Sequence, residues 1–211
     1  MLLYIFLILI ETVLLLLLQF TPSHILSDFS ARKACHSITG LIMLLLDPAL
    51  ALCRWYVYLV VVSSLSMTWL SNFPNWRFGV KYDRGITVYV TLVGAWFHLR
   101  APIQVLLPMF LADPAGAVVG ECKIFLHFIF LFSGKYVSGT FGAGVNPAWY
   151  GRKTVFGSLA VFIVTMLTLH SPPALDQRLV VSSLATLAEA VSEKYDNLLL
   201  AAVVVMAWLY T

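Results

Sequence analysis

The chain has 211 residues, of which 61% are hydrophobic and only 11% are charged, and its formal net charge is +3. A soluble domain is typically about 45–50% apolar and about 25% charged, so this composition excludes an ordinary globular domain and indicates a membrane protein. The three cysteines, Cys35, Cys53 and Cys122, have no CxxC spacing, so neither a disulfide framework nor a zinc site is indicated. No nucleic-acid partner is expected, and the composition leaves the oligomeric state open.

The N-terminal segment is nearly all apolar over residues 1–20. A cleaved signal peptide would begin with basic residues and end in a small-residue cleavage site. No Lys or Arg precedes Arg32. We therefore expect residues 2–20 to form a retained membrane helix.

Apolar segments of membrane-spanning length recur along the whole chain. A helix needs about 20 apolar residues, with a range of about 17–25, to cross the hydrocarbon layer. The segment 122–133 is apolar but too short to cross, so it is predicted to be an interfacial or re-entrant helix. The prediction is an all-α fold: a single polytopic transmembrane helix bundle over 1–211 with about eight spans, near 2–20, 37–53, 55–71, 85–99, 101–120, 154–170, 179–195 and 197–210.

The basic residues are distributed unevenly over this map. With eight crossings, one side of the membrane receives ten of the 13 Lys and Arg residues, and only Arg54, Arg100 and Arg178 fall on the other side. The positive-inside rule assigns the richer side to the cytosol, so both termini are expected on the opposite side. The assignment depends on 122–133 not crossing, because a crossing there would invert the later part of the map.

A basic group, Arg32, Lys33 and His36, directly precedes the second predicted span. Two cations and an imidazole at a helix start can hold phosphate, because exposed N–H groups and the helix dipole add positive potential there. The alternative is an ordinary positive-inside anchor.

Asp113 ends an apolar run and is followed by Pro114 and several small residues. A carboxylate close to lipid is costly and is a functional hypothesis by default. Proline and small residues are expected to break the helix here and to admit a backbone or a ligand. Because Mg²⁺ takes one or two carboxylates together with substrate phosphate oxygens, a lone Asp can suffice. The alternative is a helix cap at the interface.

Another polar group opens the seventh predicted span, at Arg152, Lys153, Thr154, Gly157 and Ser158. Lys, Thr, Gly and Ser at a helix N-terminus have the chemistry of a phosphate cradle. The GxxxxGK[ST] order of a Walker A loop is absent. The preceding loop contains Gly139, Gly142 and Gly144, which would let it close over a nucleotide. The alternative is that these glycines only form turns, as glycine in a polar loop more often does.

The last polar group contains Glu189, Glu193, Asp196 and Asn197. Glu189 and Glu193 are four residues apart and share a helix face, and Asp196 and Asn197 fall at the break before the last predicted span. Glu189 lies in an apolar stretch, so we expect it to face the protein interior rather than lipid. Glu193 is equally well explained as part of a solvated helix end.

All four groups reach the cytosolic side of the predicted map. Glu11 and Asp47 lie inside predicted spans, belong to no motif, and are interpreted as interior polar contacts. Opposed basic and acidic groups at one membrane face suit a reaction between a Mg²⁺-bound nucleotide and a lipid.

The order of these groups resembles that of the CTP-dependent lipid kinases, a family that includes dolichol kinase, the phytol and farnesol kinases and the CTP-using diacylglycerol kinase, and that is related to phosphatidate cytidylyltransferase. The family pattern runs RKxxH, D-x-x-A-x-x-x-G, K[ST]xxGS and E…DN. A glycine-bearing turn that usually follows the Asp segment is replaced here by Glu121-Cys122. The corresponding residues, within 32–197, are Arg32-Lys33 with His36, Asp113 with Gly120, Lys153-Thr154 with Gly157-Ser158, and Glu189 with Asp196-Asn197.

The resemblance implies transfer of the γ-phosphoryl group of CTP to the hydroxyl of a membrane lipid such as a polyprenol, phytol or diacylglycerol. Such transfer needs mainly positioning and charge neutralisation. His36 or Glu189 would accept the alcohol proton. The implied Mg²⁺ ligands are Asp113, Asp196 and Asn197, and the implied phosphate-binding residues are Arg32, Lys33, Gly120, Lys153, Thr154, Gly157 and Ser158.

Two alternatives stay open. A related cytidylyltransferase would join CTP to phosphatidate and release pyrophosphate, and a non-catalytic membrane protein would need neither Asp113 nor Lys153. In a eukaryote the resemblance implies the endoplasmic reticulum membrane, with the site facing the cytosol.

Overall fold

The computed structural model describes residues 1–72, 74, 76–77, 79–121, 148–150, 153–171, 174–192 and 195–210. The described part is mostly helical, with a helical fraction of 76%. Three helical segments, Leu2–Phe20, Ala51–Trp69 and Ile103–Gly120, are long and apolar enough to cross a membrane. The predicted interfacial segment 122–133 lies outside the described residues.

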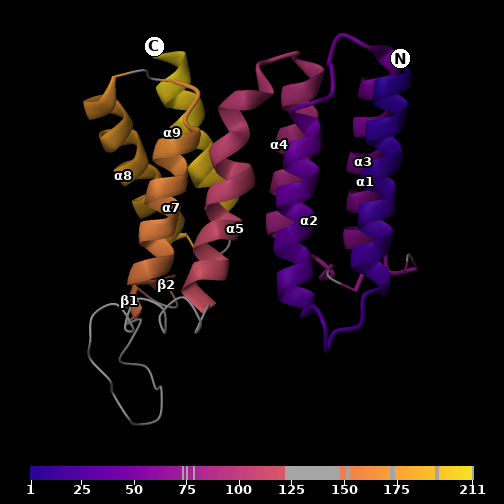
Figure 1. Ribbon diagram of the computed structural model, residues 1–211, viewed down its shortest axis with the longest axis horizontal. Helices are drawn as coiled ribbons and strands as arrows, with labels where there is room; N and C mark the ends of the chain where they lie inside the picture. Colours follow the sequence, from indigo (N-terminus) through magenta and orange to yellow (C-terminus); the bar gives the residue numbers. More distant parts are fainter. Residues whose placement is uncertain are drawn as a thin grey trace.

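Successive helices run in alternate directions, so both termini lie at one end of the molecule (Figure 1). Side-chain caps begin several of them: the Ser27 hydroxyl accepts from the Ser30 N–H, the Asp83 carboxylate from Ile86, and the Thr154 hydroxyl from Gly157. The elements are α1 Leu2–Phe20, α2 Asp28–Met43, α3 Ala51–Trp69, α4 Arg84–His98, the 3₁₀ helix η1 Ile103–Leu106, α5 Leu107–Glu121, β1 Ala148–Tyr150, β2 Lys153–Thr154, α7 Val155–Thr168, α8 Leu175–Val191 and α9 Asp196–Leu209.

Helix α5 is central, because it packs against α2, α7 and α9 (Figure 1). Its N-terminal half supplies fully buried core residues, including Met109, Phe110 and Ala112. Helix α4 packs against α3 and α9, and α8 packs against α7 and α9. This arrangement brings the N-terminal half of α2, the middle of α5 and the start of α9 together around one polar region.

Glycines allow α5 and α7 to pack at a short distance from each other. A Cβ atom added to Gly157 would lie 2.8 Å from the Gly116 carbonyl oxygen, and one added to Gly116 would lie 2.4 Å from Val161 Cγ2. Both distances are shorter than van der Waals contact, so no larger residue fits without moving a helix. Gly116 and Gly120 form a GxxxG pair, the spacing typical of closely packed helices in membranes.

The outer surface carries many exposed apolar side chains. On α1, Leu9, Val13 and Leu17 are 57%, 54% and 58% exposed, and on α3 Leu59 and Val62 are 66% and 60% exposed. Large apolar surfaces of this kind mark contact with lipid or with another protein. Their positions on two membrane-length helices agree with the composition.

Most predicted helices are found within a few residues of their expected bounds, but the predicted bounds of the second helix were wrong. The span predicted at 37–53 is instead α2, which begins at Asp28 behind the Ser27 cap and ends at Met43. Arg32 and His36 therefore lie within a helix rather than before one. Asp47 belongs to the turn that follows, where its Oδ1 accepts a hydrogen bond from the Ala49 N–H at 2.8 Å.

A further expectation was wrong. Helix α5 is not broken at Pro114, so Asp113 sits inside it and not at a cap. A proline inside a membrane helix is tolerated where neighbouring helices pack around it, as α7 and α9 do here. The described residues are mostly helical, as predicted, and the sequence interpretation missed only a short antiparallel pair, β1 with β2, in which Ala148 lies opposite Thr154. By contrast, Glu11 is fully buried on α1, with Tyr56 and Thr39 as polar neighbours, as an interior polar contact requires.

Arg77, in the loop before α4, forms hydrogen bonds with the end of α1 and with the residues that follow it. Its guanidinium donates to the carbonyl oxygens of Leu18, Thr21 and Leu26, and its backbone N–H donates to the Gln19 side chain. Arg77→Ala is expected to lower the free energy of unfolding by about 2–3 kcal/mol, since hydrogen bonds from a charged donor are lost. Denaturant titration in detergent measures the change. Arg77→Lys, which keeps the charge but not the fork of donors, should be intermediate; equal stability of all three proteins would contradict this role.

Candidate functional site

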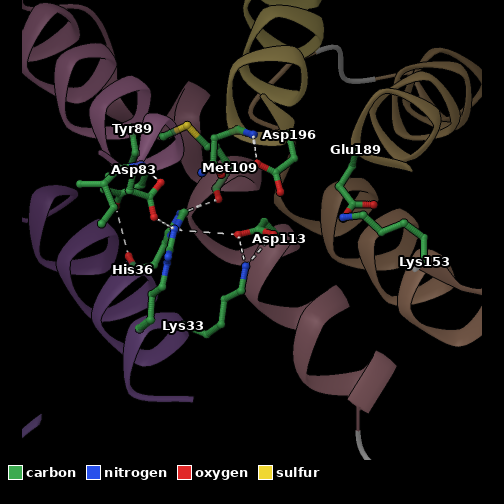
Figure 2. Close-up of polar contacts among 12 residues, drawn as sticks. Lys33, His36, Asp83, Tyr89, Met109, Asp113, Lys153, Glu189 and Asp196 are labelled. Atoms are coloured by element: carbon green, nitrogen blue, oxygen red, sulfur yellow. Dashed lines mark hydrogen bonds and ion pairs between the residues drawn. The ribbon is translucent and has the colours of Figure 1, made fainter. Parts of the chain in front are cut away.

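Asp113 lies near the middle of α5 and is 4% exposed. Lys33 from α2 donates to both of its carboxylate oxygens, with Nζ 2.9 Å from Oδ1 and 2.7 Å from Oδ2 (Figure 2). A buried carboxylate needs such a partner, because an unpaired charge in the interior is costly. This ion pair brings the basic group of α2 into contact with the acidic residue of α5.

His36 lies one turn beyond Lys33 on α2 and faces the same carboxylate. Its Nε2 is 3.1 Å from the Met109 carbonyl oxygen, and its Nδ1 is 3.9 Å from Asp113 Oδ2 (Figure 2). Because a carbonyl oxygen only accepts, Nε2 carries a hydrogen and a neutral ring keeps its lone pair on Nδ1. The Tyr89 ring lies 4.1 Å from the His36 ring, centroid to centroid, and holds it in this orientation.

Lys153 on β2 pairs with Glu189 on α8 (Figure 2). Glu189 is 4% exposed, which confirms that it faces the interior. The pair joins residues 36 positions apart in the chain. It forms the second carboxylate–lysine pair of the site.

The third acidic residue, Asp196 at the start of α9, completes a cluster of carboxylates. One oxygen each from Asp113, Glu189 and Asp196 lies within 4.8 Å of the others. An all-oxygen donor set is what a hard cation such as Mg²⁺ requires. Glu189, which was not among the predicted metal ligands, thus belongs to this cluster.

Asn197, which was predicted to join that set, follows Asp196 directly and lines a cavity together with Asp113 and Asp196. Its backbone N–H donates to Asp196 Oδ1 at 2.9 Å. Asn197 also lines the apolar cavity beside His36, and it is not among the residues that line the cavity of Glu189 and Lys153.

The N-terminus of α7 forms one wall of a cavity of about 410 Å³. The Thr154 hydroxyl caps this helix, and the Ser158 hydroxyl accepts a hydrogen bond from the Trp149 indole N–H at 2.8 Å. Exposed N–H groups and the helix dipole make such a terminus a favourable place for an anion. All four predicted groups contribute residues to the lining of this cavity: Lys33, Asp113, Gly120, Lys153, Thr154, Gly157, Ser158, Glu189 and Asp196.

Three residues predicted to bind phosphate have other contacts. Gly157 and Gly120 reach the cavity, but they also lie where α5 meets α7, so their small size is required by packing. Arg32 is not brought to the α7 terminus; its Nη2 is 2.6 Å from Asp83 Oδ2. It lines a second cavity, of about 450 Å³, on the other side of the Lys33–Asp113 pair.

The sequence interpretation missed two charged residues of this second cavity, Asp83 and Arg84. Asp83 caps α4 by accepting from the Ile86 N–H at 3.1 Å, while it also pairs with Arg32. An Asp directly before an apolar helix is a standard start signal and could have identified it. Arg152 and Glu193, which belonged to the predicted groups, lie outside the described residues, as do Gly139, Gly142 and Gly144.

Comparison of the chain with protein-family models, with curated proteins and with solved structures finds no match.

Proposed function

We propose that the protein is a membrane-bound lipid kinase that transfers the γ-phosphoryl group of CTP to a lipid hydroxyl. The observation that carries the proposal is a single cavity where five elements, α2, β2, α5, α8 and α9, present two lysines and three carboxylates beside the N-terminus of α7. A nucleoside triphosphate with its metal ion needs basic side chains for the phosphates and acidic side chains for the ion in the same site. The choice of CTP rests on the motif order alone.

The carboxylates of Asp113, Glu189 and Asp196 are suited to hold Mg²⁺ together with phosphate oxygens of the nucleotide. Their oxygens are mutually close, two of the three residues are buried, and all are hard donors. When bound, the ion supplies charge neutralisation on the transferring phosphoryl group.

Lys153, the Thr154 hydroxyl and the N–H groups at the start of α7 bind the phosphates in this proposal. Glu189 already holds Lys153, so that lysine is fixed at the cavity wall rather than free to adopt many rotamers. Positioning of this kind accounts for much of phosphoryl-transfer catalysis.

His36 is the proposed acceptor of the alcohol proton, in preference to Glu189. Its Nε2 is engaged by the Met109 carbonyl oxygen, which leaves the Nδ1 lone pair on the side of Asp113. Glu189 is instead engaged with Lys153. On transfer, the alcohol O–H bond breaks toward Nδ1, the oxygen bonds to phosphorus, and CDP leaves.

The proposal places the bundle across the membrane with the site toward the cytosol, as a multi-pass protein of about eight spans. Of the described Lys and Arg residues, Arg32, Lys33, Arg77, Lys81, Arg84 and Lys153 belong to the end that carries the site (Figure 1). Arg54, Arg100 and Arg178 belong to the other end. The positive-inside rule favours this orientation, which also gives the site access to cytosolic nucleotide. In a eukaryote the expected membrane is the endoplasmic reticulum.

Purified protein with Mg²⁺, a lipid extract and CTP labelled at the γ-phosphate is expected to release CDP and to produce a labelled lipid phosphate. Pyrophosphate release with phosphatidate as acceptor would instead identify a cytidylyltransferase. Absence of both products over a panel of polyprenols, phytol, diacylglycerol and phosphatidate would refute an enzymatic role with CTP. Substituting ATP for CTP in the same assay tests the choice of nucleotide.

A further inference from the structure

A third cavity, of about 140 Å³, lies among α1, α2, α3 and α4 and is lined mainly by apolar side chains. Leu15 of α1, Val60 and Met67 of α3 and Val90 of α4 contribute to its wall. It shares four lining residues with the 450 Å³ polar cavity: Arg32, His36, Gly85 and Asn197. An apolar space therefore adjoins the polar site at the proposed proton acceptor.

Asn197 lies at this junction with an unsatisfied acceptor. The residue is 8% exposed, and its side-chain Oδ1 has no hydrogen-bond partner among the residues that the structure describes. Buried polar atoms are normally hydrogen-bonded, and an exception at a cavity indicates a ligand donor or an ordered water. A hydroxyl group supplies such a donor.

The apolar cavity is small. A cavity of about 150 Å³ holds one benzene-sized molecule. The space of about 140 Å³ therefore matches the first carbons behind a single hydroxyl, and this size favours one chain over two.

We propose that this apolar cavity binds the hydroxyl-bearing end of a single-chain lipid alcohol, with the hydroxyl at Asn197 and His36. The hydroxyl donates to Asn197 Oδ1 on binding and turns its hydrogen toward His36 Nδ1 for transfer. Asn197 thus binds the acceptor lipid rather than the metal ion. The inference rests on the proposed kinase function for its reaction, and it names single-chain alcohols, not diacylglycerol, as the substrate class.

The test combines binding and turnover. A diazirine-bearing farnesol analogue and a diazirine-bearing diacylglycerol are photolysed with the full chain in detergent, and the labelled peptides are mapped. Two matched variants on α3 are compared: Val60→Trp fills the cavity, whereas Val62→Trp changes a side chain that is 60% exposed on the outer face. The farnesol analogue is expected to label peptides from α3 and α4, and Val60→Trp but not Val62→Trp should remove the label.

Turnover adds a second measurement. Val60→Trp is expected to lower kcat/KM for farnesol about 100-fold, since a filled pocket rejects its ligand. Asn197→Leu is expected to raise the KM for farnesol about tenfold through the lost hydrogen bond, while the KM for CTP is unchanged. A purely structural role of Asn197 would alter both constants.

The outcomes separate the two proposals. Specific labelling of the cavity without any turnover would support the lipid site and overturn the kinase function. Turnover with labelling elsewhere, equal tolerance of both Trp variants, or a preference for diacylglycerol would overturn the lipid site and leave the kinase function standing.

Discussion

Asp113→Asn is expected to reduce kcat for lipid phosphorylation by about 10²–10³-fold, the effect typical of removing one electrostatic group from a preorganised site. The carboxylate is central to the polar region: Lys33 pairs with it, His36 faces it, and Glu189 and Asp196 approach it. An amide keeps the shape but gives up the charge that would hold a cation. Initial rates at saturating CTP and Mg²⁺ measure the change.

The same substitution leaves Lys33 without its counter-charge. Breaking a buried pair by removing one partner typically costs about 3–5 kcal/mol, so Asp113→Asn is also expected to destabilise the fold. The double variant Lys33→Met/Asp113→Asn removes both charges and should recover most of that stability. It should remain inactive, which separates loss of chemistry from loss of folding.

Asp47→Asn is the matched control for this experiment. Asp47 lies in the turn between α2 and α3, at the end of the molecule that carries the termini (Figure 1). Its variant should keep wild-type turnover. Full activity of the Asp113→Asn protein would remove the central element of the proposed mechanism.

Gly157→Val is expected to disrupt the packing of α5 against α7 and, with it, the whole site. A Cβ at this position would meet the Gly116 carbonyl oxygen at 2.8 Å, and that atom is backbone, which cannot rotate away. Overpacking costs about 1–3 kcal/mol and occasionally more. Replacing glycine in a helix gains at most about 1 kcal/mol of helix propensity. The steric clash outweighs this gain, so the substitution is expected to lower the free energy of unfolding.

The expected result is a lower Tm in detergent together with reduced turnover, because Asp113 and Lys153 are positioned by the two helices that would separate. Leu159→Ala, at a residue 48% exposed on the same helix, is the control and should change Tm little. A Gly157→Val protein of normal Tm but impaired CTP binding would show that the glycine acts through phosphate and not through packing.

Much of the helical map follows from the sequence, because the apolar length of a segment is a local property. Helices α1, α4, α7 and α9 begin and end close to their predicted bounds. The error at α2 also came from reading apolar length alone. Residues 28–36 include many polar side chains and were therefore interpreted as a loop, but they form the first part of a helix that Ser27 caps. The helix forms there, although the segment is not apolar, because it is capped and because it packs against α5.

The composition of the site was also largely predictable, but its pairings were not. Charged residues at the ends of apolar runs are costly and therefore conspicuous, which identified Asp113, Lys153 and Glu189. The small residues after Asp113 predicted the close approach of a backbone, and Gly116 does lie against the backbone of Gly157.

The sequence by itself thus determined that the chain is apolar, helical and equipped with a small set of ionisable residues at predictable positions. Only the tertiary structure decided which of them meet: Lys33 with Asp113, Lys153 with Glu189, and Arg32 with Asp83. The physical reason is that these contacts join different elements, so they depend on how closely and in what register the helices pack. That register is set by contacts such as Gly116 against Gly157, which no local pattern of hydropathy contains.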